Sequence, residues 1–243
     1  MASLQEKLNM FFSVILKGES KTYNDHNWYS NGKLRGYIEG RHKQMYPQLK
    51  KNLSQYTLGD VITMQSHSRD STGQLWATGR YQIIPNTLLG LKKSLGLGNN
   101  VLYDQKTQDI MGYRLLTERK PIKDYLEGKN EDNKDNLENA AKSVAMIWSS
   151  VGVPYDMQGR KRKVKKNQSY YAGGGDVASV KTEDVQNALR NFRNGKVKNV
   201  EGENKSKGQG FSKVASKWWF LVGSIIIFGG LVALSIAKIN KKV

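Results

Sequence analysis

The sequence predicts an α+β fold: a mainly helical domain with a small β-hairpin region, followed by one C-terminal transmembrane helix. Three observations carry this prediction. Several segments place apolar residues three and four positions apart, which is the spacing of an amphipathic helix. The stretch 70–81 combines turn formers with aromatic residues, which favours a hairpin. A final segment of 20 residues contains no charged side chain.

The first predicted helix runs from about Leu4 to Lys17. Ser3 and Glu6 have the spacing of a capping box in front of apolar residues at helical intervals. A signal peptide is not expected, because the apolar run is short and an acid rather than a base precedes it. Glu19 therefore falls at or just beyond the C-terminal end of this helix.

Five more helices are predicted from their start signals and apolar periodicity. Thr57 or Asp60 can begin one in YTLGDVITMQ, and Pro85 begins another. Asp104 can cap the segment QKTQDIMGYRLLTER. A long helix is expected in LENAAKSVAMIWSSVGVP, and Thr182 is the expected N-cap of TEDVQNALRNFR.

The composition restricts the chemistry and the partners. Among the 243 residues, 39 Lys and Arg face 21 Asp and Glu, giving a net charge of +18. Such a surface attracts polyanions, which include nucleic acid, anionic lipid headgroups and bacterial cell wall. The sequence has no cysteine. Disulfides, thiolate zinc sites and cysteine nucleophiles are therefore excluded.

The C-terminal region differs in kind from the rest of the chain. As a helix, the uncharged segment Trp218–Ala237 would span about 30 Å, the thickness of a bilayer core. Two tryptophans at its start and lysines on both sides are typical of membrane interfaces. The predicted organisation is a globular domain over 1–195, a flexible basic linker over 196–216, a transmembrane helix over 217–238 and a short basic tail over 239–243.

The stretch ATGRYQIIPNTL is the most specific motif of the chain, and four others accompany it in order. These are GES…YNDHN, TLGDVITMQ, YDQKTQDIMGYRLL and SYYAGGGDVASVKTEDVQNALR. Together they resemble the lysozyme-like phage endolysins and lytic transglycosylases over nearly all of residues 10–193. The match departs at Lys21, where the family usually has glycine, and in the segments 31–55 and 160–166.

The resemblance implies a lysozyme-like fold and makes Glu19 the catalytic acid. Cleaving the β-1,4 bond of peptidoglycan requires a proton on the bridging oxygen as the bond to the anomeric carbon breaks. A carboxylic acid can supply that proton only if it still holds it near neutral pH. The negative end of a helix dipole and apolar neighbours both favour the protonated form.

A second catalytic carboxylate is not singled out by spacing. Asp25, Glu39, Asp60 and Asp70 all lie within reach in the sequence, and Asp25 is the first candidate. A muramidase would need one of them to position water. A lytic transglycosylase needs none, because the N-acetyl group of the substrate supports the cation and its 6-hydroxyl attacks. Both activities therefore remain open, with the missing partner favouring the transglycosylase.

Substrate contacts are expected from hydroxyl, amide and aromatic side chains in the matching motifs. Gln can hydrogen-bond an acetamido group, and Tyr can stack on a sugar; packing of the Tyr in the hairpin core is the alternative. No metal or cofactor is expected, because the three histidines lack ligand spacing. The predicted substrate-binding residues are Ser20, Thr78, Tyr81, Gln82, Tyr170 and Tyr171.

The sequence thus predicts a membrane-anchored enzyme that cleaves peptidoglycan glycan strands for a bacterial virus. The internal membrane of a virion is the expected location, with other virion proteins as further partners; the host membrane is the alternative. A non-catalytic lysozyme-fold component of a viral membrane complex is the second hypothesis. The run RKRKVKK at 160–166 lacks aromatic residues, so direct binding of nucleic acid is not expected.

Overall fold

In a computed structural model, the chain divides into two units, Met1–Lys198 and Asn199–Val243. The structure describes residues 3–18, 20–41, 44–70, 73–173 and 178–195. All of the described residues belong to the first unit. The predicted linker, transmembrane helix and basic tail (196–216, 217–238 and 239–243) lie outside them.

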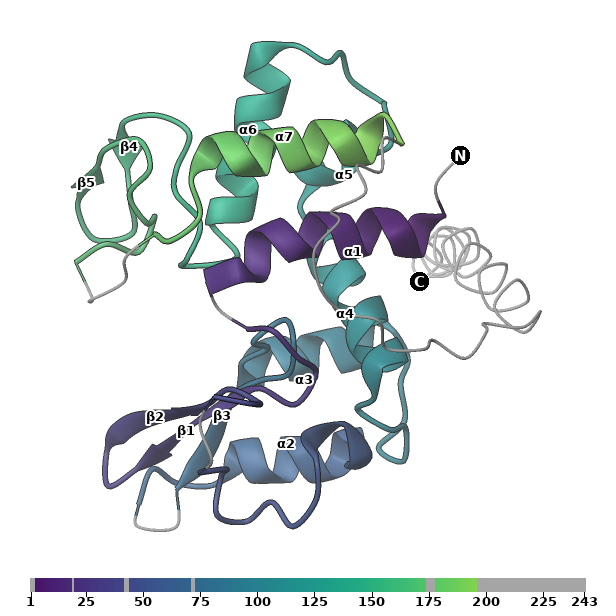
Figure 1. The fold of residues 1–243 in the computed structure, drawn as a ribbon, viewed down its shortest axis with the longest axis vertical. Coiled ribbons are helices and arrows are strands. Elements are labelled where there is room, and N and C mark those ends of the chain that lie inside the picture. The colour runs from purple at the N-terminus through teal and green to yellow at the C-terminus, as the bar shows by residue number, and fades with distance from the viewer. Residues whose placement is uncertain (1–2, 19, 42–43, 71–72, 174–177, 196–243) are drawn as a thin grey trace, which may run out of the picture. The chain divides into compact units, whose positions relative to one another are not determined.

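The described residues form a mixed α and β fold with seven α-helices and two small antiparallel sheets (Figure 1). The helices are α1 (Leu4–Ile15), α2 (Leu58–Ser66), α3 (Pro85–Ser94), α4 (Gln105–Thr117), α5 (Lys120–Leu126), α6 (Lys134–Ala145) and α7 (Thr182–Arg193). The strands are β1 (His26–Ser30), β2 (Lys33–Tyr37), β3 (Gln74–Thr78), β4 (Met157–Gln158) and β5 (Lys163–Val164). Two 3₁₀ turns cover Leu16–Gly18 and Leu53–Gln55.

The start of α1 confirms the predicted capping box. The Glu6 amide donates to Ser3 Oγ at 3.2 Å, and the Ser3 amide donates to Glu6 Oε2 at 2.7 Å. The α-helix ends at Ile15, two residues earlier than predicted, and continues as the 3₁₀ turn Leu16–Gly18. Such tightening is common where the last carbonyls of a helix lack partners.

The starts of α2, α3 and α4 agree with the sequence signals, whereas the other helices differ from the prediction. Thr57 and Asp104 cap α2 and α4 through their side chains as predicted. The last helix is preceded by Lys181, and Thr182 is its first residue rather than its cap. The long predicted helix ends at Ala145, so its C-terminal apolar residues belong to the following loop. Helix α5 was not predicted.

The larger sheet corrects the predicted hairpin. Its strand order is β2-β1-β3, so β3 pairs with the distant strand β1 rather than with a sequence neighbour. The hairpin of this sheet joins β1 to β2 through Asn31 and Gly32, whose φ values are 49° and 71°. Positive φ at both residues is the geometry of the two-residue turn that Asn-Gly favours. The stretch 70–81, predicted as a hairpin, thus contains one strand, and that strand pairs with β1.

The loops near residue 20 connect two packed groups of elements, one built on the larger sheet and one built of helices. Helix α2 packs on β3, and the buried side chains of Trp28 and Leu75 fill one face of the sheet. Helix α1 packs against α7, which also contacts α5 and α6. The two groups meet where the ring of Phe12 contacts Tyr81, with ring centroids 4.5 Å apart. The loop that follows α1 therefore crosses from the helical layer to the sheet.

Among the residues that the structure describes, no helix is both long and apolar enough to cross a membrane.

Candidate functional site

The predicted acid, Glu19, lies outside the described residues, but its chain neighbours on both sides are fixed. On one side is the 3₁₀ turn Leu16–Gly18. On the other, the Ser20 amide donates to the Leu16 carbonyl at 3.1 Å, and the Ser20 side chain is buried. The backbone is thus anchored immediately before and after the position of the acid.

Asp25 is the organising group of the loop that follows. Its carboxylate is 1 % exposed and takes five described hydrogen-bond contacts. The amides of Lys21 and Thr22 and the Ser20 hydroxyl reach Oδ2 at 2.6, 3.2 and 3.2 Å. The Thr22 hydroxyl and the Glu39 amide reach Oδ1 at 2.8 and 2.9 Å. A carboxylate has about four acceptor positions, so these contacts leave it no capacity for a catalytic water.

The same loop is joined to the motif around residue 80. The Gly79 amide donates to the Asp25 carbonyl at 2.8 Å, and the Ser20 hydroxyl lies 3.4 Å from the Gly79 carbonyl. Gly79 has φ of 70°, and a Cβ there would come within 2.1 Å of Gln108 Oε1. Only glycine fits this close crossing. The fold therefore brings together two motifs that are far apart in the sequence.

Gln82 presents its side chain beside that crossing. Its Nε2 donates to the Gly79 carbonyl at 2.9 Å, and its Oε1 accepts from Asn27 Nδ2 at 3.0 Å. Both amides are half-buried. Gly36 lies opposite Asn27 on β2, where a Cβ would come within 2.7 Å of Asn27 Oδ1. The paired amides can turn a donor and an acceptor toward a ligand such as an acetamido group.

Tyr81 and Thr78 are placed in the interior. Tyr81 is 2 % exposed, and its hydroxyl donates to Asp109 Oδ1 at 2.5 Å. Burial is the main cause that raises the pKa of Tyr81 above its ordinary value. Thr78 is fully buried, and its hydroxyl donates to the Ile83 carbonyl at 3.0 Å. These contacts support the packing alternative for Tyr81 rather than stacking on a sugar.

A polar network behind the loop fixes Tyr23. The Tyr23 hydroxyl donates to Asp109 Oδ1 at 2.9 Å and accepts from Arg80 Nη1 at 2.7 Å. Burial, opposed by the charge of Arg80 and reinforced by that of Asp109, raises the pKa of Tyr23 to about 12. Gln108 adds a bond from Nε2 to the Tyr23 carbonyl at 3.0 Å. No motif of the sequence indicated this network.

Tyr170 and Tyr171 lie after the β4–β5 hairpin, in a part of the chain separate from the loops around Ser20 and Gln82. Their rings are edge to face with centroids 5.2 Å apart. The Tyr171 hydroxyl donates to the Met146 carbonyl at 2.8 Å, beyond the end of α6. Both side chains are half-buried, and their assignment as substrate contacts stays a prediction.

The remaining candidate carboxylates have different surroundings. Asp60 completes the capping box of α2 with Thr57. Asp70 lies in the turn before β3, within contact of Ser68. Glu39 accepts the Asn24 side-chain amide at 3.2 and 3.3 Å, next to the Asp25 cluster, and is half-buried. Of these carboxylates, Glu39 lies beside the loop and keeps acceptor capacity.

His26 lies under this loop as a neutral, fully buried ring. Its Nδ1 is 2.7 Å from the Asn24 carbonyl, and its Nε2 accepts the Tyr46 amide at 3.0 Å. Nε2 can accept only when it carries no proton, so Nδ1 is the protonated nitrogen. Burial lowers the pKa of His26, although the Asn24 carbonyl and the charge of Asp25 oppose the shift.

We predict that His26 makes the unfolding free energy fall as the pH drops below about 6.5. The unfolded state binds a proton from that pH downward, whereas the folded state resists until the pH reaches its lower pKa. Thermal unfolding of wild type and His26→Gln at pH 7.5 and 5.0 measures this. The wild type should lose more stability between the two pH values than the variant does. Equal losses would show that His26 does not carry the effect.

In comparisons with known proteins, no protein-family model matches the chain. No curated protein and no solved structure matches it either. Within the described ranges, no group of three or more His, Asp or Glu side chains is placed to hold a metal ion.

Sequence reasoning missed the two features that shape the site. Asn27 falls within the motif GES…YNDHN but was not among the predicted site residues, although its place on β1, one residue before the buried Trp28, puts it on the opposite face of the sheet. The Tyr23–Arg80–Asp109 network joins three separate segments, so spacing in one segment could not reveal it. In the strand HNWYS, successive side chains point to opposite faces of the sheet, and this alternation was the signal that could have indicated the position of Asn27.

Proposed function

We propose that the protein cleaves the β-1,4 bond between MurNAc and GlcNAc in peptidoglycan, with Glu19 as the general acid. The observation that carries this proposal is the junction of the Ser20–Asp25 loop with Gly79 and Gln82. Position 19 directly precedes this junction in the sequence. Hydrogen-bonding amides of the kind that recognise acetamido groups lie at the same junction.

The chemistry needs one proton at a fixed point. Glu19 would donate it to the bridging oxygen while the bond to the anomeric carbon breaks, and the resulting carboxylate would then act as base. Gln82 and Asn27 would orient the N-acetyl group of the bound sugar. Asp25 would act through the backbone, because it fixes the amides that follow Glu19 rather than touching substrate.

Loss of turbidity from a suspension of purified peptidoglycan sacculi tests this proposal. The full chain should lower the turbidity and release soluble muropeptides. A suspension that stays turbid under conditions where the chain is folded would contradict the proposal.

The contacts of Asp25 favour the transglycosylase over the muramidase. A muramidase needs a second carboxylate that can hold water, and Asp25 is filled by its five contacts. In a transglycosylase, the substrate's own 6-hydroxyl attacks and leaves a 1,6-anhydro end. Glu39 is the described carboxylate of the candidate set that could still serve a hydrolase.

We predict that Glu39→Gln leaves both the cleavage rate and the 1,6-anhydro product ends unchanged. Glutamine keeps the size of the side chain and can still accept the Asn24 amide, so the loop should remain in place. Liquid chromatography with mass spectrometry of the released fragments measures the ends. Reducing ends in the wild-type digest together with a loss of activity in Glu39→Gln would assign the water-positioning role to Glu39 and make the enzyme a muramidase.

The proposed cellular setting rests on segment 217–238, which the sequence predicts to be a membrane anchor behind a flexible linker. A wall-cleaving domain tethered to a bilayer suits a virus whose particle contains a membrane and whose genome must cross the wall. Detection of the protein in purified particles would support this location, and its restriction to infected cells would contradict it.

A further inference from the structure

The sequence motif that the proposed function leaves unexplained is the basic run 160–166. It folds as the turn and second strand of the β4–β5 hairpin, which we call the basic hairpin and define as residues 157–166. All six of its cations are exposed: Arg160, Lys161, Arg162, Lys163, Lys165 and Lys166.

One of the six cations is neutralised within the described part of the chain. Lys166 Nζ lies 2.7 Å from Glu183 Oε1 in α7, and a hydrogen bond from this lysine helps lower the pKa of Glu183 to about 2. The structure gives the other five cations no ion pair with a described residue. Five like charges on one short hairpin repel one another, and an anionic partner would relieve that repulsion.

The hairpin is held firmly enough to present these charges in a fixed arrangement. The Gly159 amide donates to the Arg162 carbonyl at 2.9 Å, and the Arg160 amide donates to the Tyr170 carbonyl at 2.9 Å. A Cβ on Gly159 would come within 2.7 Å of the Tyr170 carbonyl oxygen, so the strand crosses its neighbour closely. At the base, Asn167 Oδ1 accepts the Thr182 amide of α7 at 2.7 Å.

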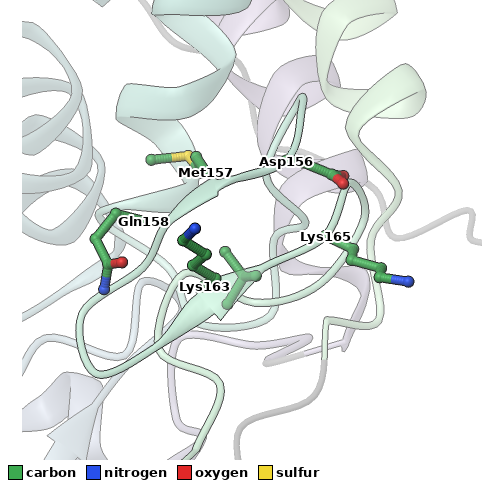
Figure 2. Close-up of a pocket in the computed structure, with 6 residues that line it drawn as sticks. Asp156, Met157, Gln158, Lys163 and Lys165 are labelled. Atoms are coloured by element: carbon green, nitrogen blue, oxygen red, sulfur yellow. The ribbon is translucent and has the colours of Figure 1, made fainter.

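A hollow of about 430 Å³ lies along the hairpin (Figure 2). The residues that line it are Asp156, Met157, Gln158, Lys163, Val164 and Lys165. Figure 2 shows the Lys163 and Lys165 side chains leaving the hairpin in different directions. The two ammonium groups can therefore bind separate anionic groups of one polymer.

The composition of the basic hairpin restricts the partner. It contains no aromatic residue on which a base could stack, which argues against single-stranded nucleic acid. Its apolar residues are Met157, which is half-buried, and Val164, which is 2 % exposed, so it offers no side chain to insert into a bilayer. In Figure 1 the hairpin extends on the same side of the unit as the C-terminal end of α1. Glu19 follows this end of the helix in the sequence.

We propose that the basic hairpin binds the carboxylates of the peptide stems that branch from the glycan strand. This inference rests on the proposed function, because the stems belong to the polymer that Glu19 would cleave. Contacts to successive stems would hold the strand while the acid acts on the sugar bond. Each exposed pair contributes little, so the binding energy comes from several pairs acting together.

The test measures binding without cleavage, using the full chain with Glu19→Gln in a mild non-ionic detergent. The hairpin variant carries Arg162→Gln, Lys163→Gln and Lys165→Gln. The control variant carries Arg119→Gln, Lys92→Gln and Lys93→Gln, which removes the same charges near α3 and α5. Co-sedimentation is measured with sacculi freed of attached phosphate polymers, with immobilised glycan strands stripped of stems, and, after dilution of the detergent below its micelle-forming concentration, with anionic phospholipid vesicles.

We expect the hairpin variant to bind intact sacculi about tenfold more weakly than the control variant, and stripped strands equally well. Equal binding of both variants to intact sacculi would overturn the inference. A loss confined to vesicles would also overturn it and assign the hairpin to a membrane surface. Thermal unfolding of both variants checks that they are folded. Binding is measured without turnover, so the two proposals can fail separately. A chain that binds through the hairpin but never cleaves would refute only the proposed function.

Discussion

Substituting Glu19 by glutamine is expected to reduce the rate of peptidoglycan clearing by about 10²- to 10⁴-fold. Glutamine has the shape of the acid but no proton to donate to the bridging oxygen. The neighbouring anchors, from Leu16 to Ser20 and from Ser20 to Gly79, involve backbone and hydroxyl groups that the substitution leaves intact. The loss should therefore be a loss of chemistry, with the fold unchanged.

Zymography in gels that contain peptidoglycan measures this effect, and Glu6→Gln is its matched control. Glu6 is exposed at the other end of α1, and glutamine can also complete a capping box. The control should clear the gel as the wild type does. Equal clearing by wild type and Glu19→Gln would remove Glu19 from the mechanism.

Substituting Asp25 by asparagine is expected to cost about 1–3 kcal/mol in the free energy of unfolding and to lower activity strongly. Asparagine replaces one acceptor oxygen by a donor, which would face donors such as the Lys21 and Thr22 amides or the Glu39 amide. These groups are part-buried and would lose their partner. The backbone that follows Glu19 should then move, so activity falls even in the folded protein.

Thermal unfolding together with sacculus clearing measures both parts of this prediction. Asp60→Asn is the control, because that carboxylate accepts from Thr57 in an exposed capping box. Its loss should lower stability only by the smaller amount typical of a helix cap, with clearing retained. An Asp25→Asn protein that is as stable and active as the control would show that the five contacts do not order the site.

Much of the helical part of the fold could be predicted, because the signals are local. Ser3 with Glu6, Thr57 with Asp60, and Asp104 each combine a capping side chain with the apolar spacing that follows. Helix α6 was predicted too long because its apolar spacing continues into the next loop, where those residues still pack in the core. The periodic spacing of apolar residues alone does not distinguish a helix from a buried loop that follows it.

The sheet could not be predicted from neighbouring residues. The turn formers before Gln74 suggested a local hairpin, whereas β3 pairs with β1, more than forty residues earlier. Long-range pairing depends on which faces can be buried together, here those of Trp28 and Leu75. The turn at Asn31 and Gly32 carried a clear hairpin signal that the sequence analysis did not use.

The sequence predicted which segments lie together at the candidate site better than it predicted the contacts of each side chain. The motifs placed the segments of Ser20 and Gln82 in one site, and the structure joins them. The motifs could not show side-chain direction, so Tyr81 and Thr78 were expected at the surface of the site and are buried. Asp25 was considered as a catalytic group, but its carboxylate is occupied by hydrogen bonds from its own loop.

The most direct test of the proposed chemistry is mass spectrometry of the fragments released from purified sacculi by wild type and by Glu19→Gln. Fragments that end at MurNAc in the 1,6-anhydro form should appear with the wild type and be absent with the variant. The same fragments from both proteins, or no MurNAc-terminated fragment from the folded wild type, would contradict an acid-catalysed cleavage at Glu19.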